Sequence, residues 1–317
     1  MKKIKIKNFS PLIGIVLFLY IITKTDLNKL LIVLKQVNIK LILLALVMSI
    51  ITILLMNLRW TRIIQAMKID INYSDCLPMF LKSLAIGAIT PGRIGELYRA
   101  KYLKDKTKKN IGETLSSVVL DRIYDLLSLL VLSLIGVLLL THFYITTLPV
   151  YIIILFIIIL FLSLIALLNK KTANFFILPL INLIIPKKNK ETSRLQYDVF
   201  FTTINKLKFY NYFEVLSITI LIWFINFVRL YIIAISLNIN ISFWFILIIS
   251  PVIIVLNLVP ITISGLGTMQ ASSIYLFSIK DIPPEPAIAF SFLCIIFGIW
   301  LISLPGITLL LFDKKSR

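Results

Sequence analysis

The sequence predicts an all-α polytopic membrane protein with about six full spans and two re-entrant helical hairpins, arranged as an inverted-topology repeat. Of the 317 residues, 59% are apolar and 15% are charged, which is more hydrocarbon than a soluble domain of this length can bury. Several apolar runs reach the roughly 20 residues that cross a bilayer. Lys and Arg gather in short clusters between these runs, as in the cytoplasmic loops of membrane proteins.

Six segments are predicted to cross the membrane. The first follows a basic head and resembles a signal peptide, but no small-residue cleavage site comes after it, so we interpret it as an uncleaved span. The other five are long apolar runs. The predicted spans are residues 9–24, 39–58, 111–141, 148–168, 214–237 and 287–312.

The charge distribution predicts the orientation. Basic clusters lie at the N-terminus, after residue 58, over residues 99–109 and at the C-terminus, and residues 169–213 form a basic linker. Because basic loops stay on the cytoplasmic side, both termini are predicted to be cytoplasmic, in the cell membrane.

Two further segments are predicted to enter the membrane and return on the same side. Residues 76–98 lie between two inside clusters, and residues 243–278 must start and finish outside. The first is broken by Thr90-Pro91-Gly92. The second is broken by Pro251, Pro260 and Ser264-Gly265-Leu266-Gly267. An alternative is that residues 243–261 form a full span, which would place the basic C-terminus outside.

These segments form one domain over residues 1–317 with an internal symmetry. Repeat one covers about 39–141 and repeat two about 214–312, with the linker 169–213 before the second. Each contains a span, a hairpin and a span, in opposite orientations. The sequence echo is short, Asn57-Leu58-Arg59 against Asn226-Phe227-Val228-Arg229. Interrupted helices at corresponding places of inverted repeats indicate a transporter's binding site.

The two hairpin tips are candidate anion sites. Thr90 can cap a helix that has Pro91 at its first position, followed by Gly92, so its free amides and positive dipole end would point into the membrane. Ser264, Gly265 and Gly267 can do the same from the other side. Two such helix ends would attract an anion, of which a lipid phosphate is the obvious example.

Ionised side chains inside predicted membrane segments are further candidates, because they are costly there unless paired. Their spacing puts Arg93, Glu96 and Arg99 on one helical face, which would line a polar cavity. The others are Asp121, Arg122, Asp125 and Arg229. Two interpretations remain open: structural pairing that joins the repeats, or direct contact with substrate.

Other function classes lack support in the sequence. A net charge of +19 is compatible with nucleic acid, but its distribution in short loop clusters is typical of membrane topology. The two cysteines and the single histidine form no metal or redox spacing. Nucleotide-binding and hydrolase motifs are absent, so we predict no enzyme activity, cofactor or metal.

Three motifs in this order resemble the membrane domain of lysylphosphatidylglycerol synthases, the flippase-like proteins. They are TPGRIGELYRA at residues 90–100, DRIYDLL at 121–127 and LNLVPITISGLGTMQ at 256–270. The resemblance implies a membrane domain without the soluble aminoacyltransferase domain, and it adds Gly95 and Gln270 to the candidate substrate-binding residues. At position 270 the family usually carries Glu, and a glycine often stands where this chain has Ser264.

The expected function is a lipid translocase or scramblase that moves an anionic or modified phospholipid between leaflets. The phosphate would meet both hairpin tips, with Arg93 as its side-chain partner. One alternative is a carrier of a polyprenyl-phosphate or its glycolipid. An alternative of another class is a membrane subunit that presents lipid to a separate aminoacyl- or glycosyltransferase.

Overall fold

The computed structural model describes residues 10–144, 148–168, 170–175, 179, 190–204, 209–258 and 265–315, and every regular element within these ranges is a helix. In chain order they are α1 (Ser10–Lys24), α2 (Leu27–Lys35), α3 (Ile39–Ala66), α4 (Tyr73–Ala88), η2 (Pro91–Leu97), α5 (Tyr98–Thr107), α6 (Ile111–Phe143), α7 (Leu148–Leu168), α9 (Lys190–Ile204), α10 (Phe209–Ser236), α11 (Phe243–Leu256), α12 (Thr268–Ser278), α13 (Pro284–Ile295), η4 (Ile296–Trp300) and α14 (Leu301–Lys315). Of the two η elements, η2 is a 3-10 helix and η4 is a π-helix.

Four helical stretches are long and apolar enough to cross a membrane. They are Ile39–Ala66, Ile111–Phe143, Phe209–Ser236 and Pro284–Asp313, the last of which joins α13, η4 and most of α14. Shorter apolar helices accompany them, and α7 has the bounds that the sequence predicts. The prediction of an all-helical, multi-spanning membrane protein is confirmed at this level.

Two of the spanning helices extend beyond their predicted ends. Helix α3 continues from Leu58 to Ala66, and α10 begins at Phe209, inside the predicted linker. The linker also contains α9. The reason is that hydropathy shows where the side chains become polar, whereas a helix ends where the backbone leaves the helical conformation and its hydrogen bonds stop. Here α3 ends at Ala66, two residues before Lys68, whose φ of 62° is left-handed, and the N–H of Ile69 bonds back to the carbonyl of Ile64.

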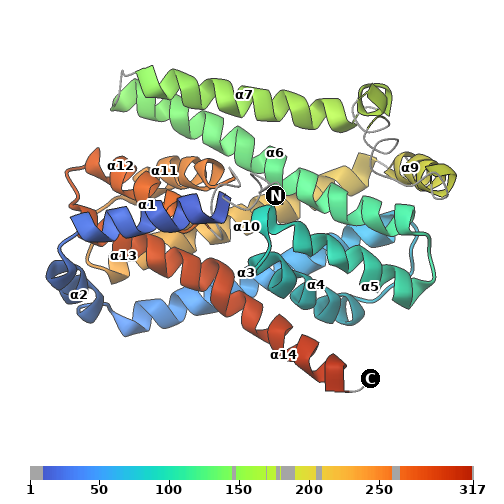
Figure 1. Ribbon diagram of the computed structural model, residues 1–317, viewed down its shortest axis with the longest axis horizontal. Helices are drawn as coiled ribbons and strands as arrows, with labels where there is room; N and C mark the ends of the chain where they lie inside the picture. The colour runs from blue at the N-terminus through green and yellow to red at the C-terminus, as the bar shows by residue number, and fades with distance from the viewer. Residues whose placement is uncertain are drawn as a thin grey trace, which may run out of the picture.

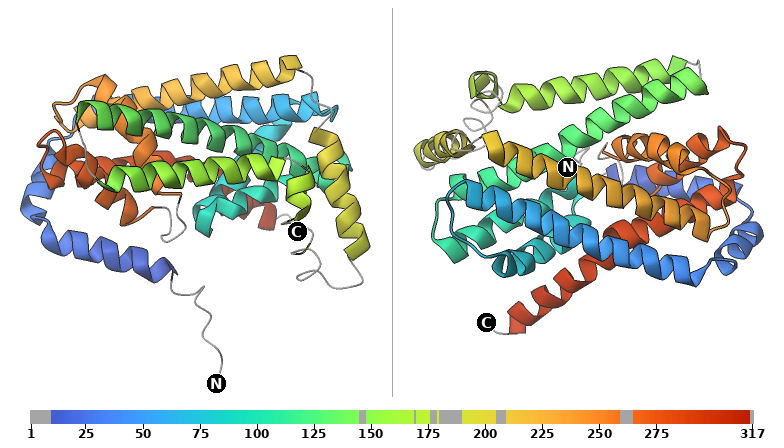
Figure 2. Two further views of the ribbon diagram at one scale, coloured as in Figure 1. Left: turned by 90° about the horizontal axis from the view of Figure 1, so that it is seen from above. Right: turned by 180° about the vertical axis from the view of Figure 1, so that it is seen from behind.

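Helices α3 and α10 form an antiparallel pair along one face of the molecule, and they lie nearest the viewer when it is seen from behind (Figure 2, right). The N–H of Asn38 donates to the carbonyl of Ser236 at 2.9 Å, so the start of α3 adjoins the end of α10. At the other end, Arg62 lies 3.2 Å from Glu214. The two helices have equal length. The same difference in residue number therefore separates the first residues of the two helices, Ile39 and Phe209, and their last residues, Ala66 and Ser236. We call this constant difference the repeat offset.

Each half of the chain also contains a helical hairpin next to this pair. In the first half α4 leads to a turn at residues 89–90, after which η2 and α5 return along it. In the second half α11 and α12 pack together. Each hairpin packs against a long helix of the other half of the chain: α4 lies against α14, and α11 lies against α6. We call these the exchanged hairpins. A glycine of each long helix makes the close approach possible, Gly306 beneath the carbonyl of Leu81 and Gly136 beneath that of Ile248.

The expected helix breaks are partly wrong. Pro251 does not interrupt its segment but lies inside α11, as Pro78 lies inside α4. The carbonyl of Pro251 accepts a hydrogen bond from the Ser133 hydroxyl at 2.9 Å. Pro91 begins a 3-10 helix, and the α-helix starts only at Tyr98, so an α-helical end does not form at the first tip. Ser264 and Pro260 lie outside the described residues.

Candidate functional site

The tip of the first hairpin is held together by Thr90. Its hydroxyl oxygen accepts from the N–H of Gly95 at 2.9 Å and lies 3.1 Å from the carbonyl of Ile86. Gly95 packs directly on the backbone of Ile86, where a Cβ would meet the carbonyl oxygen at 2.6 Å. This tight turn gives Arg93 a φ of 55°, which is unusual for a residue other than glycine.

A second close approach positions Glu96. Gly87 of α4 faces it so closely that a Cβ at residue 87 would collide with the Glu96 side chain. Glu96 is 2% exposed, and its carboxylate forms an ion pair with Arg122 of α6. The hairpin therefore delivers a buried carboxylate to the spanning helix next to it.

Asp121 of α6 lies at the centre of a fully buried ion-pair cluster. It accepts from Arg59 Nε at 2.7 Å and from Arg99 Nη2 at 2.6 Å, and all three side chains are 0% exposed. The Arg99 guanidinium also lies over the rings of Trp60 and Phe80, at 4.9 and 5.1 Å from their centroids. Asp121 thus joins α3, α5 and α6 in a single contact.

Asp125 lies one helical turn further along α6 and links this cluster to the hairpin tip. It accepts from Arg59 Nη1 at 2.6 Å, and its other oxygen lies 3.5 Å from Arg122. Arg122 in turn pairs with Glu96. A continuous chain of alternating charges therefore runs from the buried Asp121 to the surface of a pocket.

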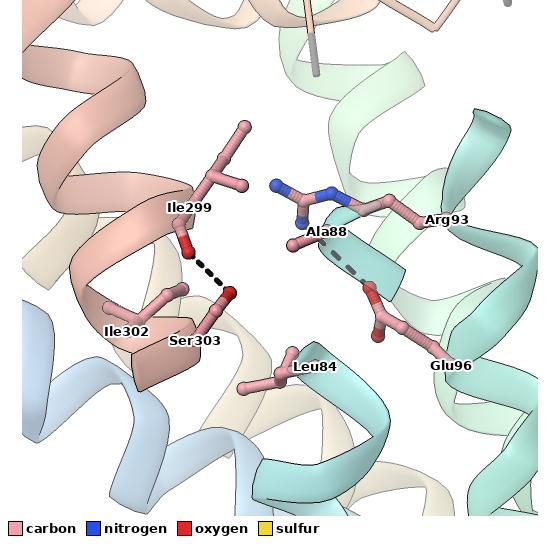
Figure 3. Close-up of a pocket in the computed structure, with 7 residues that line it drawn as sticks. All are labelled: Leu84, Ala88, Arg93, Glu96, Ile299, Ile302 and Ser303. Carbon is pink, nitrogen blue, oxygen red and sulfur yellow. Dashed lines mark hydrogen bonds and ion pairs between the residues drawn. The ribbon is translucent and has the colours of Figure 1, made fainter. Parts of the chain in front are cut away.

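That pocket lies between the first hairpin and the last spanning helix (Figure 3). Its polar side chains on the hairpin are Arg93 and Glu96, 3.9 Å apart. Figure 3 shows Arg93 extending across the pocket toward Ile299 of η4. Arg93 is 43% exposed, the most accessible arginine of the cluster. The pocket is lined by Leu84, Ala88, Arg93, Glu96, Ile299, Ile302 and Ser303.

Arg229 of α10 lies close behind the pocket. Its guanidinium donates to Asn226 Oδ1 at 2.6 Å, to the carbonyl of Phe297 at 3.3 Å and to the Ser49 hydroxyl at 3.4 Å. Phe297 belongs to the π-helix η4, a conformation that is rare and frequent at functional sites.

The second hairpin has an uncharged tip. Gly265 and Gly267 both adopt positive φ, at 80° and 89°, which a side chain would strain. The side-chain oxygen of Gln270 accepts from the N–H of Gly267 at 2.7 Å and caps α12. Asn257 accepts from the Thr268 hydroxyl at 2.6 Å and so joins the end of α11 to the start of α12. The preceding residue of the tip, Ser264, is not among those that the structure describes.

The structure gathers several of the predicted site residues and separates others. Arg93, Glu96, Arg122 and Asp125 form one connected group beside the pocket. Arg99 does not share their face, because the backbone turns at the 3-10 helix and its side chain enters the buried cluster with Asp121. Gly265, Gly267 and Gln270 belong to the second hairpin and shape its backbone.

Arg59 is the site residue that sequence reasoning missed. It follows the last residue of a predicted span, so it resembles the start of a basic loop. In the structure it is buried and bonds both Asp121 and Asp125. The signal that could identify it is the continued apolar period beyond it, at Trp60, Ile63 and Ile64.

The part of the chain that the structure describes contains no group of three His, Cys, Asp or Glu side chains placed to hold a metal ion. The three carboxylates that do gather in the interior, Glu96, Asp121 and Asp125, all bind arginine. The described interior therefore contains a network of paired guanidinium and carboxylate groups.

Long apolar helices that enclose a cluster of arginines and carboxylates define a multi-pass helical membrane protein with a buried polar site. The chain belongs to the family described as the lysylphosphatidylglycerol synthase transmembrane region, whose family model matches residues 9–306. The resemblance that the three motifs indicate is therefore confirmed.

Three relatives carry the name UPF0104 membrane protein. One from Methanocaldococcus jannaschii is 32% identical over 130 residues, 39% of this chain and 38% of its own length. A second from that organism is 28% identical over 204 residues, 64% of this chain and 83% of its own length. One from Methanothermobacter thermautotrophicus is 24% identical over 281 residues, 84% and 83% of the two chains. No solved structure matches the chain.

Proposed function

We propose that this protein is a translocase or scramblase that moves a phosphate-bearing lipid between leaflets, through a polar site between two inverted repeats. The single observation that carries the proposal is the pocket at Arg93. An arginine whose guanidinium extends from a hairpin tip into a pocket lined by the opposite half of the chain is suited to hold a phosphate.

The inverted repeat is supported by position-for-position correspondence at the repeat offset. Helices α3 and α10 correspond at both ends, and α4 and α11 begin at corresponding residues. The glycines that receive the exchanged hairpins, Gly136 and Gly306, also correspond. So do Ser133 and Ser303, each of which donates its hydroxyl to the carbonyl four residues earlier in the chain. Antiparallel packing of α3 and α10 gives the two halves opposite directions.

The charge balance of the interior supports an anionic ligand. Four arginines, Arg59, Arg93, Arg99 and Arg122, form ion pairs with three carboxylates, and the buried Arg229 behind the pocket has only neutral partners. An excess of buried positive charge is costly in a membrane protein unless a counter-ion is bound. A lipid headgroup phosphate would supply that charge, while the apolar surface beside the pocket would meet its chains.

Roles can be assigned on this proposal. Arg93 contacts the phosphate directly, whereas Arg122 and Glu96 hold the hairpin tip in position. Asp121 with Arg59 and Arg99 is the structural centre that fixes α6 to its neighbours. Gly265, Gly267 and Gln270 shape the corresponding tip on the other side. The basic ends of the helices face the cytoplasm.

The test is transport in proteoliposomes by purified Arg93→Lys, with the leaflet distribution of a fluorescent phospholipid as the readout. Lysine keeps the charge but cannot form the bidentate contact, so we expect the variant to insert normally and to lose most of its transport. Lys104→Gln, an exposed residue of α5, is the matched control and should transport as the wild type does. Wild-type transport by Arg93→Lys would refute a phosphate site at the first hairpin.

A further inference from the structure

Arg59 and Arg229 occupy equivalent places in the two halves of the chain. The repeat offset separates them, as it separates the helices that carry them. Arg59 Nη1 donates to the hydroxyl of Thr219 at 3.3 Å, and Arg229 Nη1 donates to the hydroxyl of Ser49 at 3.4 Å. Ser49 and Thr219 are separated by the same offset, so the two hydrogen bonds are related by the same symmetry.

The surroundings of the two arginines differ in charge. Arg59 binds Asp121 through Nε and Asp125 through Nη1. At the positions that correspond to these two acids in repeat two, the chain has Ser291 and Ile295. The Ser291 hydroxyl donates to the carbonyl of Ile288 within its own helix, at 2.7 Å. Repeat one therefore neutralises its arginine, and repeat two contains no equivalent acid.

Arg229 is consequently a buried cation with only neutral partners. It is 9% exposed, and Nε, the atom that binds Asp121 in the equivalent arginine, has no partner among the described residues. No ion pair joins Arg229 to a carboxylate within the described ranges, which contain all 14 acidic residues of the chain. When one partner of a buried ion pair is removed, the remaining charge is uncompensated and costly. Arg229 is in this situation in the native protein, because the sequence of repeat two has no acid at the corresponding positions.

We infer that Arg229 is the second arginine of the anion site and that the ligand is the phosphate of a lipid headgroup without a cationic group. This inference rests on the proposed function. Arg229 lies behind the π-helix that forms one wall of the pocket and donates to its Phe297 carbonyl, while Arg93 enters from the opposite wall. A phosphate held by Arg93 would therefore also supply a counter-charge near Arg229. The residues that line the pocket offer a headgroup cation no aromatic ring and one carboxylate, Glu96, which is already paired with Arg122.

The experiment measures the melting temperature of the detergent-purified protein against three probes. Dioctanoyl phosphatidate, which carries a net negative charge, should raise the melting temperature in a saturable manner. Dioctanoyl phosphatidylcholine, with a balancing cation, should not. An equal rise with both lipids would overturn the selection against cationic headgroups. An equal rise with inorganic phosphate alone at matched concentration would overturn the assignment to a lipid.

Two variants test the role of Arg229. Ser291→Asp places a carboxylate where repeat one has Asp121, so we expect a higher melting temperature without ligand and phosphatidate affinity reduced about tenfold or more. Ser278→Asp makes the same change at an exposed position of α12 and should leave both values unaltered. If Ser291→Asp does not fold, Arg229→Met removes the cation instead and should also abolish the phosphatidate response. Wild-type affinity in Arg229→Met would overturn the inference.

The outcomes separate this inference from the proposed function. If the wild type transports lipid but responds equally to phosphatidate and phosphatidylcholine, the charge selectivity is wrong and the translocase proposal stands. If phosphatidate binding depends on Arg229 but no lipid changes leaflet in proteoliposomes, the anion site stands and the translocase proposal fails.

Discussion

At the scale of single residues, Asp121 makes the most consequential contacts of the interior. It binds two arginines from different helices with no exposed surface on any of the three side chains. Arg99 has no partner for its Nε and Nη1 among the described residues, because those atoms face the aromatic rings of Trp60 and Phe80. The carboxylate is therefore the main counter-charge of two buried cations.

Asp121→Asn should destabilise the protein severely. Neutralising one member of a buried ion pair leaves its partners uncompensated, at a cost of about 3–5 kcal/mol. We expect a large fall in melting temperature, with transport reduced in proportion to the folded fraction. Asp105→Asn, an exposed acid of α5, should change stability by less than about 0.5 kcal/mol. If Asp121→Asn melts as the wild type does and yet fails to transport, Asp121 contacts the substrate.

The sequence predicted the types of residue in the site better than their partners. Arg93, Glu96 and Asp125 were recognisable because charge within apolar segments is rare. Their pairing was not, because Arg59 is 62 residues from Asp121 and lies beyond an apolar run. The positive φ of Arg93 follows from the packing of Gly95 on Ile86, a contact between two arms that a local pattern does not contain.

At the scale of elements, the exchanged hairpins depend on glycine. Helix α4 crosses α14 at Gly306, and α11 crosses α6 at Gly136, and in both places a Cβ would collide with a carbonyl oxygen of the hairpin. Small residues at such crossings allow helices in membranes to approach closely. These contacts hold the two halves of the chain together.

Gly306→Ala and Gly136→Ala should each reduce stability by about 1–3 kcal/mol, because the added methyl group meets backbone that cannot rotate away. The measurement is the melting temperature in detergent. Gly298→Ala provides the control, since the nearest atoms to a Cβ there belong to the Arg229 guanidinium, at an ordinary 3.5 Å. Wild-type stability in both crossing variants would mean that the hairpins pack less closely than we describe.

The cap of α12 accounts for the unusual residue at position 270. The Gln270 side-chain oxygen accepts from the N–H of Gly267, a role that a glutamate oxygen fills equally well. Gln270→Leu should therefore cost about 1 kcal/mol through loss of the cap, whereas Gln270→Glu should retain it. Comparing the two melting temperatures checks this. Equal losses in both variants would show that the cap bond contributes nothing.

Element positions were predicted well where hydropathy determines them and less well elsewhere. The bounds of α7 agree with prediction because both ends of its apolar run are sharp. Helix α3 continues past its apolar run to Ala66, since Arg59 finds carboxylates that make a polar helix end acceptable in the interior. Pro251 was expected to break its segment, yet α11 contains it without interruption.

At the scale of the whole molecule, the basic elements gather at one end. Figure 1 shows α5, α9 and the end of α14 toward one end of the molecule, with α2, the end of α6 and the start of α7 toward the other. Ion pairs reinforce this clustering, since Lys106 of α5 lies 3.0 Å from Asp75 at the start of α4. The distribution agrees with the proposed cytoplasmic position of the basic loops.

Cysteine accessibility in intact cells tests that orientation. The native Cys76 and Cys294 are free and buried, so replacing both gives a background for single probes. Lys106→Cys, at the basic end, should react with an impermeant maleimide only after the membrane is opened. Asn240→Cys, exposed after the end of α10, should react from outside.

The decisive probe is Lys315→Cys. If α11 and α12 form a hairpin that enters and leaves the membrane on one side, the chain crosses the membrane an even number of times between Lys106 and the end of α14. Both positions then lie on the same side. With its 14 residues, α11 extends only about 21 Å, shorter than the hydrocarbon core. We therefore expect Lys315→Cys to behave as Lys106→Cys does. Labelling from outside would make α11 part of a full span and would exclude the inverted repeat on which the proposed transport path depends.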